Sequence, residues 1–377
     1  MSAPAARLLR LAVRDFRNLA HLDLSPPPDG IVVVGENGQG KTNLLESIYY
    51  LQILRSVRGA RDPDLVRFGA DGFHVGATIE TDARHEAGVG FERLGKRKRV
   101  RIDGAIPERM SDALGTLPSV MFSPADVDLI GGAPGVRRRF LDIMLALTAP
   151  GYLTALQSYR GALSRRNAAL RATGAGATAR KPSGTVAVWE PPLAHHGAVL
   201  WTARRAWVEQ AHARFQNLCH EIGEPSAVRV RYAAALGDSV DPTAALSRAL
   251  EERRDHDIRR GMTHAGPHRD DLLITLDGRE LRVFGSAGQQ RTAAIALRML
   301  EAATFSAQAG RAPLFLLDDP FAELDARRSS RILGLLAHNG IGQTVLAVPR
   351  EGDIPAQLTG LDRIRLSNGA IDPWPGE

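Results

Sequence analysis

Apolar and polar positions repeat in two ways along the chain, with a strand-like period toward both ends and a helical period between them. Alternation over residues 8–24 and 73–103 predicts short strands, and the apolar runs 31–34 and 314–317 predict buried strands. From about residue 134 to 260 apolar residues recur at helical spacing, with one helix starting at Pro134 and another running from Asp241 to about Gly261. Strands are expected again at 272–276 and 281–284. The pattern predicts an α/β protein with an inserted, mainly helical region. The sequence has no sustained heptad repeat, so a long coiled coil is not expected.

Composition adds limits but no function. The chain has 377 residues, with 44% hydrophobic and 24% charged residues, which is typical of a globular protein. Its apolar runs are far too short to span a bilayer, so no membrane partner is expected. Residues 1–10 lack the apolar stretch of a signal peptide, and the single cysteine, Cys219, permits no intrachain disulfide. We therefore expect a cytoplasmic protein. The net charge of +6 is compatible with an anionic partner such as DNA, but the predominance of arginine over lysine favours codon usage in a GC-rich genome as its cause.

A glycine-rich segment carries the strongest chemical signal. Residues 35–42 match the P-loop pattern G-x-x-x-x-G-K-[ST] at every fixed position, between a predicted strand and a predicted helix. Glycines let backbone N–H groups approach phosphate oxygens, Lys41 can neutralise the β- and γ-phosphates, and the Thr42 hydroxyl can bind Mg²⁺. A chance glycine-rich turn is the alternative, and the strand and helix around the motif disfavour it. The sequence thus predicts an ATP site made by Gly35, Glu36, Asn37, Gly38, Gln39, Gly40, Lys41 and Thr42.

Two acidic residues follow the second apolar run and resemble a Walker B motif. Asp318 at the strand end is expected to hold Mg²⁺, and Asp319 is expected to act with Lys41 in catalysis by orienting or deprotonating the attacking water. A helix cap or turn after a strand is the alternative. The presence of the P-loop in the same chain favours the catalytic interpretation.

The segment that starts the helix before Walker B has two interpretations. Ser286, Gly288 and Gln289 either form a simple helix N-cap or belong to the signature segment of ATP-binding-cassette proteins. In that class the signature contacts the γ-phosphate of a nucleotide held by the opposite subunit, and Asp325 lies where the class places its D-loop. The order of the three motifs favours the second interpretation and predicts an ATP-dependent homodimer.

Arginine clusters are candidates for DNA contacts. Arg97, Arg99 and Arg101 form the first cluster and are predicted to share one strand face, where they could contact DNA phosphates. The alternative for every such cluster is an ordinary solvated surface. The second candidate cluster consists of Arg137, Arg138 and Arg139. The polar segment 263–271 contains two histidines and two aspartates, but its Gly-Pro step disfavours a zinc-binding helix, so a loop near DNA or phosphate is expected instead.

The combination of motifs resembles the RecF family of bacterial DNA replication and repair ATPases over nearly the whole chain. The resemblance rests on the P-loop with its flanking residues, on Gly-Pro-His-Arg-Asp-Asp at 266–271, on Ser-Ala-Gly-Gln-Gln-Arg-Thr at 286–292 and on the segments at 16–19 and 317–325. It implies an ABC-type, SMC-like P-loop ATPase head. It also adds Arg17, Asn18 and Asn43 to the nucleotide-binding residues.

The same resemblance implies partners and an activity. RecF-like proteins dimerise around ATP and Mg²⁺, bind DNA, and act with RecO and RecR to load RecA at single-strand gaps. We therefore expect slow, DNA-stimulated ATP hydrolysis and binding at junctions of single- and double-stranded DNA. The expected lobes are an ATPase lobe at 1–125, a helical lobe at 126–262 and a second ATPase part at 263–377. A transport-type ABC ATPase subunit and a non-hydrolysing DNA-binding scaffold are the alternatives.

Overall fold

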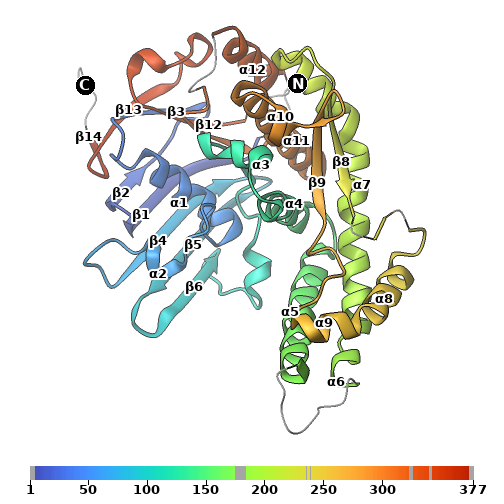
Figure 1. The fold of residues 1–377 in the computed structure, drawn as a ribbon. Helices are drawn as coiled ribbons and strands as arrows, with labels where there is room; N and C mark the ends of the chain where they lie inside the picture. The colour runs from blue at the N-terminus through green and yellow to red at the C-terminus, as the bar shows by residue number, and fades with distance from the viewer. Residues whose placement is uncertain are drawn as a thin grey trace. The chain divides into compact units, whose positions relative to one another are not determined.

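The computed structural model describes residues 5–174, 184–234, 236–237, 239–321, 326–338 and 342–372. The chain divides into two compact units (Figure 1). Unit 1 comprises residues 1–127, 221–223 and 291–377, and unit 2 comprises residues 128–220 and 224–290. The expected boundary at residue 263 was therefore wrong, because residues 263–290 pack within unit 2.

Unit 1 contains an antiparallel sheet of five strands in the order β2-β1-β4-β5-β6. Its strands alternate buried and exposed residues, as expected for a sheet with one covered face. The predicted strands over 8–24 and 73–103 are confirmed. Their bounds are β1 Arg7–Phe16, β2 Leu19–Leu24, β4 Gly72–Glu80, β5 Arg84–Glu92 and β6 Arg97–Ile102.

A second sheet of six strands forms the core of unit 1, in the order β14-β13-β3-β12-β11-β7. All neighbours from β13 to β7 run parallel, and β14 is antiparallel to β13. β3, β11 and β12 are buried at every position, which is typical of parallel strands covered on both faces. The bounds are β3 Gly30–Val34, β7 Ser119–Phe122, β11 Leu314–Asp318, β12 Thr344–Val348, β13 Asp362–Ser367 and β14 Ala370–Asp372.

Helix α1 (Lys41–Ile53) contacts strands of both sheets of unit 1. It packs on β7, β11 and β12 of the parallel sheet and on β1, β4 and β5 of the antiparallel sheet. Eleven of its residues are buried, because it has apolar neighbours all round. Phe16, Tyr50 and Phe73 form an edge-to-face aromatic cluster on its antiparallel side. The other helices of unit 1 are α2 Asp62–Leu65, α12 Ala326–His338 and most of α11 Ala287–Ala309, with short 3₁₀ turns at Leu94–Lys96, Met110–Ala113, Pro124–Val127, Glu351–Asp353 and Ala356–Leu358.

Unit 2 is mainly helical, as the sequence predicted. Its longest helix is α7, Glu190–Ile222, and its predicted helix at Pro134 is α4, Pro134–Thr148 (Figure 1). The single helix expected from Asp241 to Gly261 is two helices, joined at Arg253, and Gly261 ends the second one in the left-handed conformation. The remaining bounds are α3 Asp128–Gly131, α5 Tyr152–Gly174, α6 Gly184–Ala187, α8 Pro242–Glu252, α9 Arg254–Arg260 and α10 Leu281–Phe284.

Unit 2 also contains a small antiparallel sheet, in the order β10-β9-β8. Its strands are β8 Val228–Ala233, β9 Asp271–Leu276 and β10 Arg279–Glu280. The strand expected at 281–284 was wrong, since these residues form the short helix α10. Only Leu281 of that helix is buried, so four apolar-rich residues did not distinguish a strand from a helical turn. In the described part of the chain, no helix combines the length and hydrophobicity needed to cross a bilayer.

Candidate functional site

Three neighbouring parallel strands of unit 1 bring the predicted ATP-binding motifs together. β12 lies between β3 and β11, so the carboxyl ends of all three strands meet at one edge of the sheet. The P-loop leaves the end of β3, and Asp318 closes β11. Ligands of open α/β sheets bind at this edge. The expected proximity of the P-loop and Walker B motifs is therefore present in the structure.

The P-loop has the backbone shape that its glycines make possible. Gly38 and Gly40 have φ angles of 83° and 110°, in the region that favours glycine. A Cβ on Gly40 would come within 2.6 Å of the Asn18 side chain. Lys41, the first residue of α1, folds back so that its ammonium donates to the carbonyl oxygens of Gly35 and Glu36, the latter at 2.9 Å. Burial lowers the pKa of Lys41, and the carboxylates of Asp318 and Asp319 counteract that shift.

Thr42 and Asp318 are in direct contact across 276 residues of sequence. The Thr42 hydroxyl lies 2.9 Å from Oδ2 and 3.1 Å from Oδ1 of Asp318. Burial raises the pKa of Asp318, while the Thr42 hydroxyl and the Lys41 ammonium act in the opposite direction. A hydroxyl and a carboxylate at this separation form an oxygen donor set of the kind that Mg²⁺ prefers.

Asp319 follows directly and differs from its neighbour. Its φ angle is 43°, an uncommon left-handed conformation for a residue other than glycine, and its N–H donates to the carbonyl of Ala347 at 2.9 Å. Burial and the nearby Asp353 carboxylate raise its pKa, whereas Arg291 and Lys41 counteract them. A partly exposed carboxylate with a raised pKa is suited to accept a proton.

The residues added by the family resemblance support the P-loop from its flank. Asn18 donates to the Gln39 carbonyl at 3.1 Å and accepts from Asn43 at 2.8 Å. Arg17 instead forms paired hydrogen bonds of 3.1 and 3.2 Å with Glu46, a fully buried carboxylate on α1. These contacts place Asn18 and Asn43 beside the loop and bind Arg17 to the helix that follows it.

Sequence reasoning missed a second support for the loop, from the turn between β13 and β14. The Asn368 N–H donates to Gln39 Oε1 at 2.5 Å, and the Gly369 N–H donates to the Gln39 carbonyl at 2.9 Å. An adjoining cavity of about 670 Å³ is lined by the outer side of the P-loop together with Arg350 and Arg365. Neither arginine belongs to a recognisable motif. In this part of the sequence only Asn368-Gly369 indicates a structure, namely a turn.

The signature segment begins α11 in unit 2. Ser286 Oγ accepts from the Gln289 N–H at 3.3 Å, and Gln289 Oε1 accepts from the Ser286 N–H at 2.9 Å, which is a reciprocal capping box. The Gln289 amide also reaches Glu224 at 3.3 Å. Within one chain Ser286 therefore acts as a helix cap. Its side chain is also exposed, so it remains accessible to another molecule. Asp325 and the rest of the D-loop segment lie outside the described residues, as does most of the 174–185 segment.

The first arginine cluster has the predicted geometry. Arg97, Arg99 and Arg101 are exposed on one face of β6 and line a groove of about 300 Å³. His74 on β4 and Gly88 on β5 also line this groove. The cluster is therefore positioned on an open sheet face of unit 1.

The second arginine cluster corrects a prediction. Arg137 is 3% exposed, forms paired hydrogen bonds with Asp271 at 2.8 and 2.9 Å and donates to three backbone carbonyls, so it was wrong as a DNA-contact candidate. Arg138 donates to the Asp270 carbonyl at 2.7 Å, and burial lowers its pKa. Arg138 and Arg139 remain partly exposed.

The Gly-Pro-His-Arg-Asp-Asp segment makes internal contacts in unit 2. His268 bonds to the Tyr159 hydroxyl at 2.6 Å and to the Thr263 carbonyl at 3.0 Å. Asp270 accepts from the Tyr232 hydroxyl at 2.5 Å. Burial lowers the pKa of His268 to about 4, so it is neutral at physiological pH. The segment is thus held in place by contacts within unit 2, and its expected position near DNA or phosphate stays a prediction.

Comparisons with known proteins agree with this geometry. The family described as "RecF/RecN/SMC N terminal domain" matches residues 7–351. The "DNA replication and repair protein RecF" of Anaeromyxobacter sp. (strain K) is 40% identical, over 97% of this chain and 95% of the relative, and that of Frankia alni is 39% identical, over 94% and 96%. Among solved structures, "the recombination mediator protein RecF-ATPrS in RecFOR pathway" has a TM-score of 0.89 and 27% identity, covering 98% of this chain and 99% of that one.

A more distant structure shows the fold class alone. An Smc head domain from Pyrococcus furiosus has a TM-score of 0.57 and 15% identity, covering 97% of this chain and 95% of that one. Its similarity agrees with the parallel sheet, the P-loop and the inserted helices described above, and the fold is that of an ABC-type ATPase head. With matches of this extent to relatives of one name, the chain belongs to the RecF family within the RecF/RecN/SMC proteins.

Proposed function

We propose that this chain is a cytoplasmic, ATP-dependent DNA-binding protein of recombinational repair and replication restart. Two copies join around ATP, bind DNA at junctions of single and double strands, and act with RecO and RecR to load RecA at gaps. The observation that carries the proposal is the contact of Thr42 with Asp318, with Lys41 and Asp319 beside it. The RecF relatives favour this function over a transport-type ATPase.

The proposed ATP site uses each group for one task. The P-loop N–H groups and the start of α1 bind the phosphates, and Lys41 exchanges its bonds to loop carbonyls for bonds to the β- and γ-phosphates. Thr42 and Asp318 would hold Mg²⁺, which neutralises phosphate charge when bound. Their oxygen donors and mutual distance fit that ion.

Hydrolysis is assigned to Asp319. Its carboxylate takes a proton from the water whose oxygen attacks the γ-phosphorus, while the bond between that phosphorus and the ADP oxygen breaks. Its raised pKa favours proton acceptance. Ser286, Gly288, Gln289 and Asp325 of a second copy are proposed to complete the site, since Ser286 is exposed at the start of α11. Slow ATP hydrolysis is suited to a switch in which ATP binding drives dimerisation and hydrolysis later ends it.

DNA is assigned to Arg97, Arg99 and Arg101 on the open face of β6, with Arg138 and Arg139 as secondary candidates. Their guanidinium groups would contact backbone phosphates, so binding is expected to be salt-dependent and weakly sequence-dependent.

The direct test measures three properties on one preparation of the full chain. Sedimentation velocity with and without ATP is expected to show a shift from monomer to dimer, ATP hydrolysis is expected to be slow and to rise with gapped DNA, and RecA filament formation on gapped DNA is expected to need RecO and RecR as well. A chain that binds DNA but stays monomeric and inactive with saturating ATP would support the non-hydrolysing scaffold instead.

A further inference from the structure

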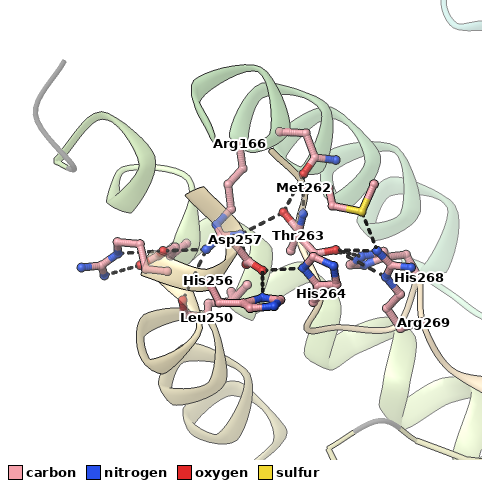
Figure 2. Close-up of polar contacts among 12 residues, drawn as sticks. Arg166, Leu250, His256, Asp257, Met262, Thr263, His264, His268 and Arg269 are labelled. Carbon is pink, nitrogen blue, oxygen red and sulfur yellow. Dashed lines mark hydrogen bonds and ion pairs between the residues drawn. The ribbon is translucent and has the colours of Figure 1, made fainter. Parts of the chain in front are cut away.

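Three potential metal ligands lie together in unit 2, and none of them is among the residues assigned to ATP or DNA. His256 and Asp257 belong to α9, and His264 follows the turn at Gly261 that ends this helix. One ligand atom from each side chain lies within 4.8 Å of the others. Figure 2 shows both imidazoles directed at the same oxygen of Asp257. His264 Nδ1 is 2.7 Å and His256 Nδ1 is 3.9 Å from that Oδ1 atom.

The carboxylate of Asp257 is held in a fixed orientation. Its other oxygen, Oδ2, accepts from Arg166 Nη1 at 2.7 Å, and both side chains are fully buried. Arg166 is anchored in turn by Glu190 at 3.0 Å and by the Thr263 hydroxyl at 2.9 Å (Figure 2). This arrangement leaves Oδ1 for the two histidines. Metal-binding carboxylates and imidazoles are commonly oriented by such outer partners.

The donor types select a class of metal. Two imidazole nitrogens and one carboxylate oxygen suit zinc and similar transition metals, whereas Mg²⁺ and Ca²⁺ prefer oxygen ligands alone. We propose that His256, Asp257 and His264 form a binding site for a divalent transition metal of the Zn²⁺ class, with water completing the coordination. This inference is independent of the ATP and DNA functions proposed above.

The three ligand atoms lie within 4.8 Å of one another and would have to adopt the closer spacing of a metal site. With metal bonds of about 2.0–2.2 Å, tetrahedral ligand atoms lie roughly 3.3 Å apart. The contact of His264 with Asp257 must open by about half an ångström, and that of His256 must close by a similar amount. Both rings can rotate, because the His256 side chain is 47% exposed and that of His264 is 25% exposed. The rings already meet edge to face, with centroids 4.8 Å apart.

The site would add to existing contacts between α9 and the segment after it, which are a backbone hydrogen bond from Met262 to Asp257, the bonds of Arg166 to Asp257 and Thr263, and the His264–Asp257 contact. Metal binding would fix α9 to the residues that directly precede the Gly-Pro-His-Arg-Asp-Asp segment at 266–271. His268 does not belong to the site, since its two ring nitrogens contact Tyr159 and the Thr263 carbonyl. The alternative is that His264 and Asp257 form only a structural hydrogen bond, to which His256 would contribute nothing.

The test titrates Zn²⁺ alone into the full chain, free of any purification tag and stripped with a chelator, by calorimetry. The wild type is expected to bind one ion per chain. His256→Gln and His264→Gln are each expected to lower the affinity at least about tenfold. The matched control is His212→Gln on α7, an exposed histidine of the same unit, which should bind like the wild type.

A second measurement protects the test against misfolding. Zn²⁺ should raise the melting temperature of the wild type and of His212→Gln but not of His256→Gln, whose exposed side chain can change without opening the core. The visible absorption of bound Co²⁺ should indicate nitrogen and oxygen ligands. No zinc binding by the wild type, equal binding by His256→Gln, or equal loss in His212→Gln would overturn the proposed site.

Discussion

The buried charges of unit 2 and those at the strand ends of unit 1 are satisfied by different kinds of partner. In unit 2, Arg166 is paired with Asp257 and Glu190, Arg204 with Asp142, and Arg137 with Asp271. At the strand ends of unit 1, Lys41 instead bonds to backbone carbonyls and Asp318 to a hydroxyl. Arginine–carboxylate pairs fix structure, whereas a lysine and carboxylates bonded to neutral groups can exchange those bonds for a charged ligand. This difference separates the structural charges of unit 2 from the charges proposed to act on ATP.

The largest expected effect is on the stability of unit 2. Arg166→Met leaves the buried Asp257 without its main counter-charge, so the free energy of unfolding should fall by about 3–5 kcal/mol. Urea unfolding followed by circular dichroism measures this. The control is Arg165→Met, an exposed neighbour on α5 that stacks on Trp189, which should cost about 1 kcal/mol or less. Equal losses in both variants would mean that the buried pair does not stabilise unit 2.

The second prediction concerns catalysis in unit 1. Asp319→Asn should slow ATP hydrolysis at least about a hundredfold, because the amide cannot accept the proton of the attacking water. ATP affinity should stay near the wild-type value, since the P-loop is unchanged. Steady-state hydrolysis and nucleotide titration measure the two properties. Asp362→Asn, an exposed residue of β13, is the control. Wild-type turnover by Asp319→Asn would assign the base to another group.

The third prediction tests whether Lys41 is a ligand-binding charge. Lys41→Ala should weaken ATP binding about ten- to a hundredfold, because a charged hydrogen bond contributes about 1.5–3 kcal/mol. Fluorescent-nucleotide titration measures the affinity. Lys96→Ala removes an exposed lysine of the same unit and should have no effect. Unchanged affinity in Lys41→Ala would remove Lys41 from the site.

A smaller effect is expected on DNA binding. Arg99→Glu should lower the slope of log affinity against log salt by about one, since one phosphate contact is lost. Fluorescence anisotropy with a gapped duplex at several salt concentrations measures the slope. Arg109→Glu makes the same change of charge at an exposed site outside the groove. If both variants behave alike, only net charge matters and the β6 groove is not the contact surface.

The smallest expected effect is a pH dependence of unit 2. The pKa of His268 is lowered from its ordinary value of 6.5 to about 4. The unfolded chain therefore takes up a proton below about pH 6.5 that the folded chain takes up only near pH 4. The stability from neutral His268 is fully present above pH 6.5 and is lost as the pH falls toward 4. Urea unfolding at pH 7.5 and 5 should show a smaller loss in His268→Gln than in the wild type, and equal losses would contradict the assignment.

The sequence predicted what depends on local pattern and missed what depends on distant partners. The P-loop was recognisable because its glycines and lysine lie between a buried strand and a helix, and the contact of Thr42 with Asp318 follows from parallel strands sharing an edge. Arg137 was assigned wrongly because its partner Asp271 lies 134 residues away. The support of Gln39 by the 368–369 turn was invisible for the same reason.

The helical region shows the same limit at short range. Residues 281–284 were expected as a strand, because a four-residue segment with three apolar residues is too short to show a helical or a strand period. In the sequence, the Gly-Pro step of the polar segment 263–271 argued against its histidines as ligands of a zinc site. The structure changes this because the end of α9 brings His256 beside His264, whereas His268 is occupied elsewhere.

The most direct test of the central proposal mixes two inactive variants. Ser286→Arg should disable the site to which its signature segment contributes while leaving its own P-loop intact, and Lys41→Ala should leave the signature segment intact. In a mixed dimer one site then carries both lesions and the other carries neither. An equimolar mixture should recover up to about a quarter of the wild-type ATPase rate, because half of randomly paired dimers are mixed and each has one intact site. No recovery at any ratio, with both variants folded, would contradict an ATP site shared between two copies.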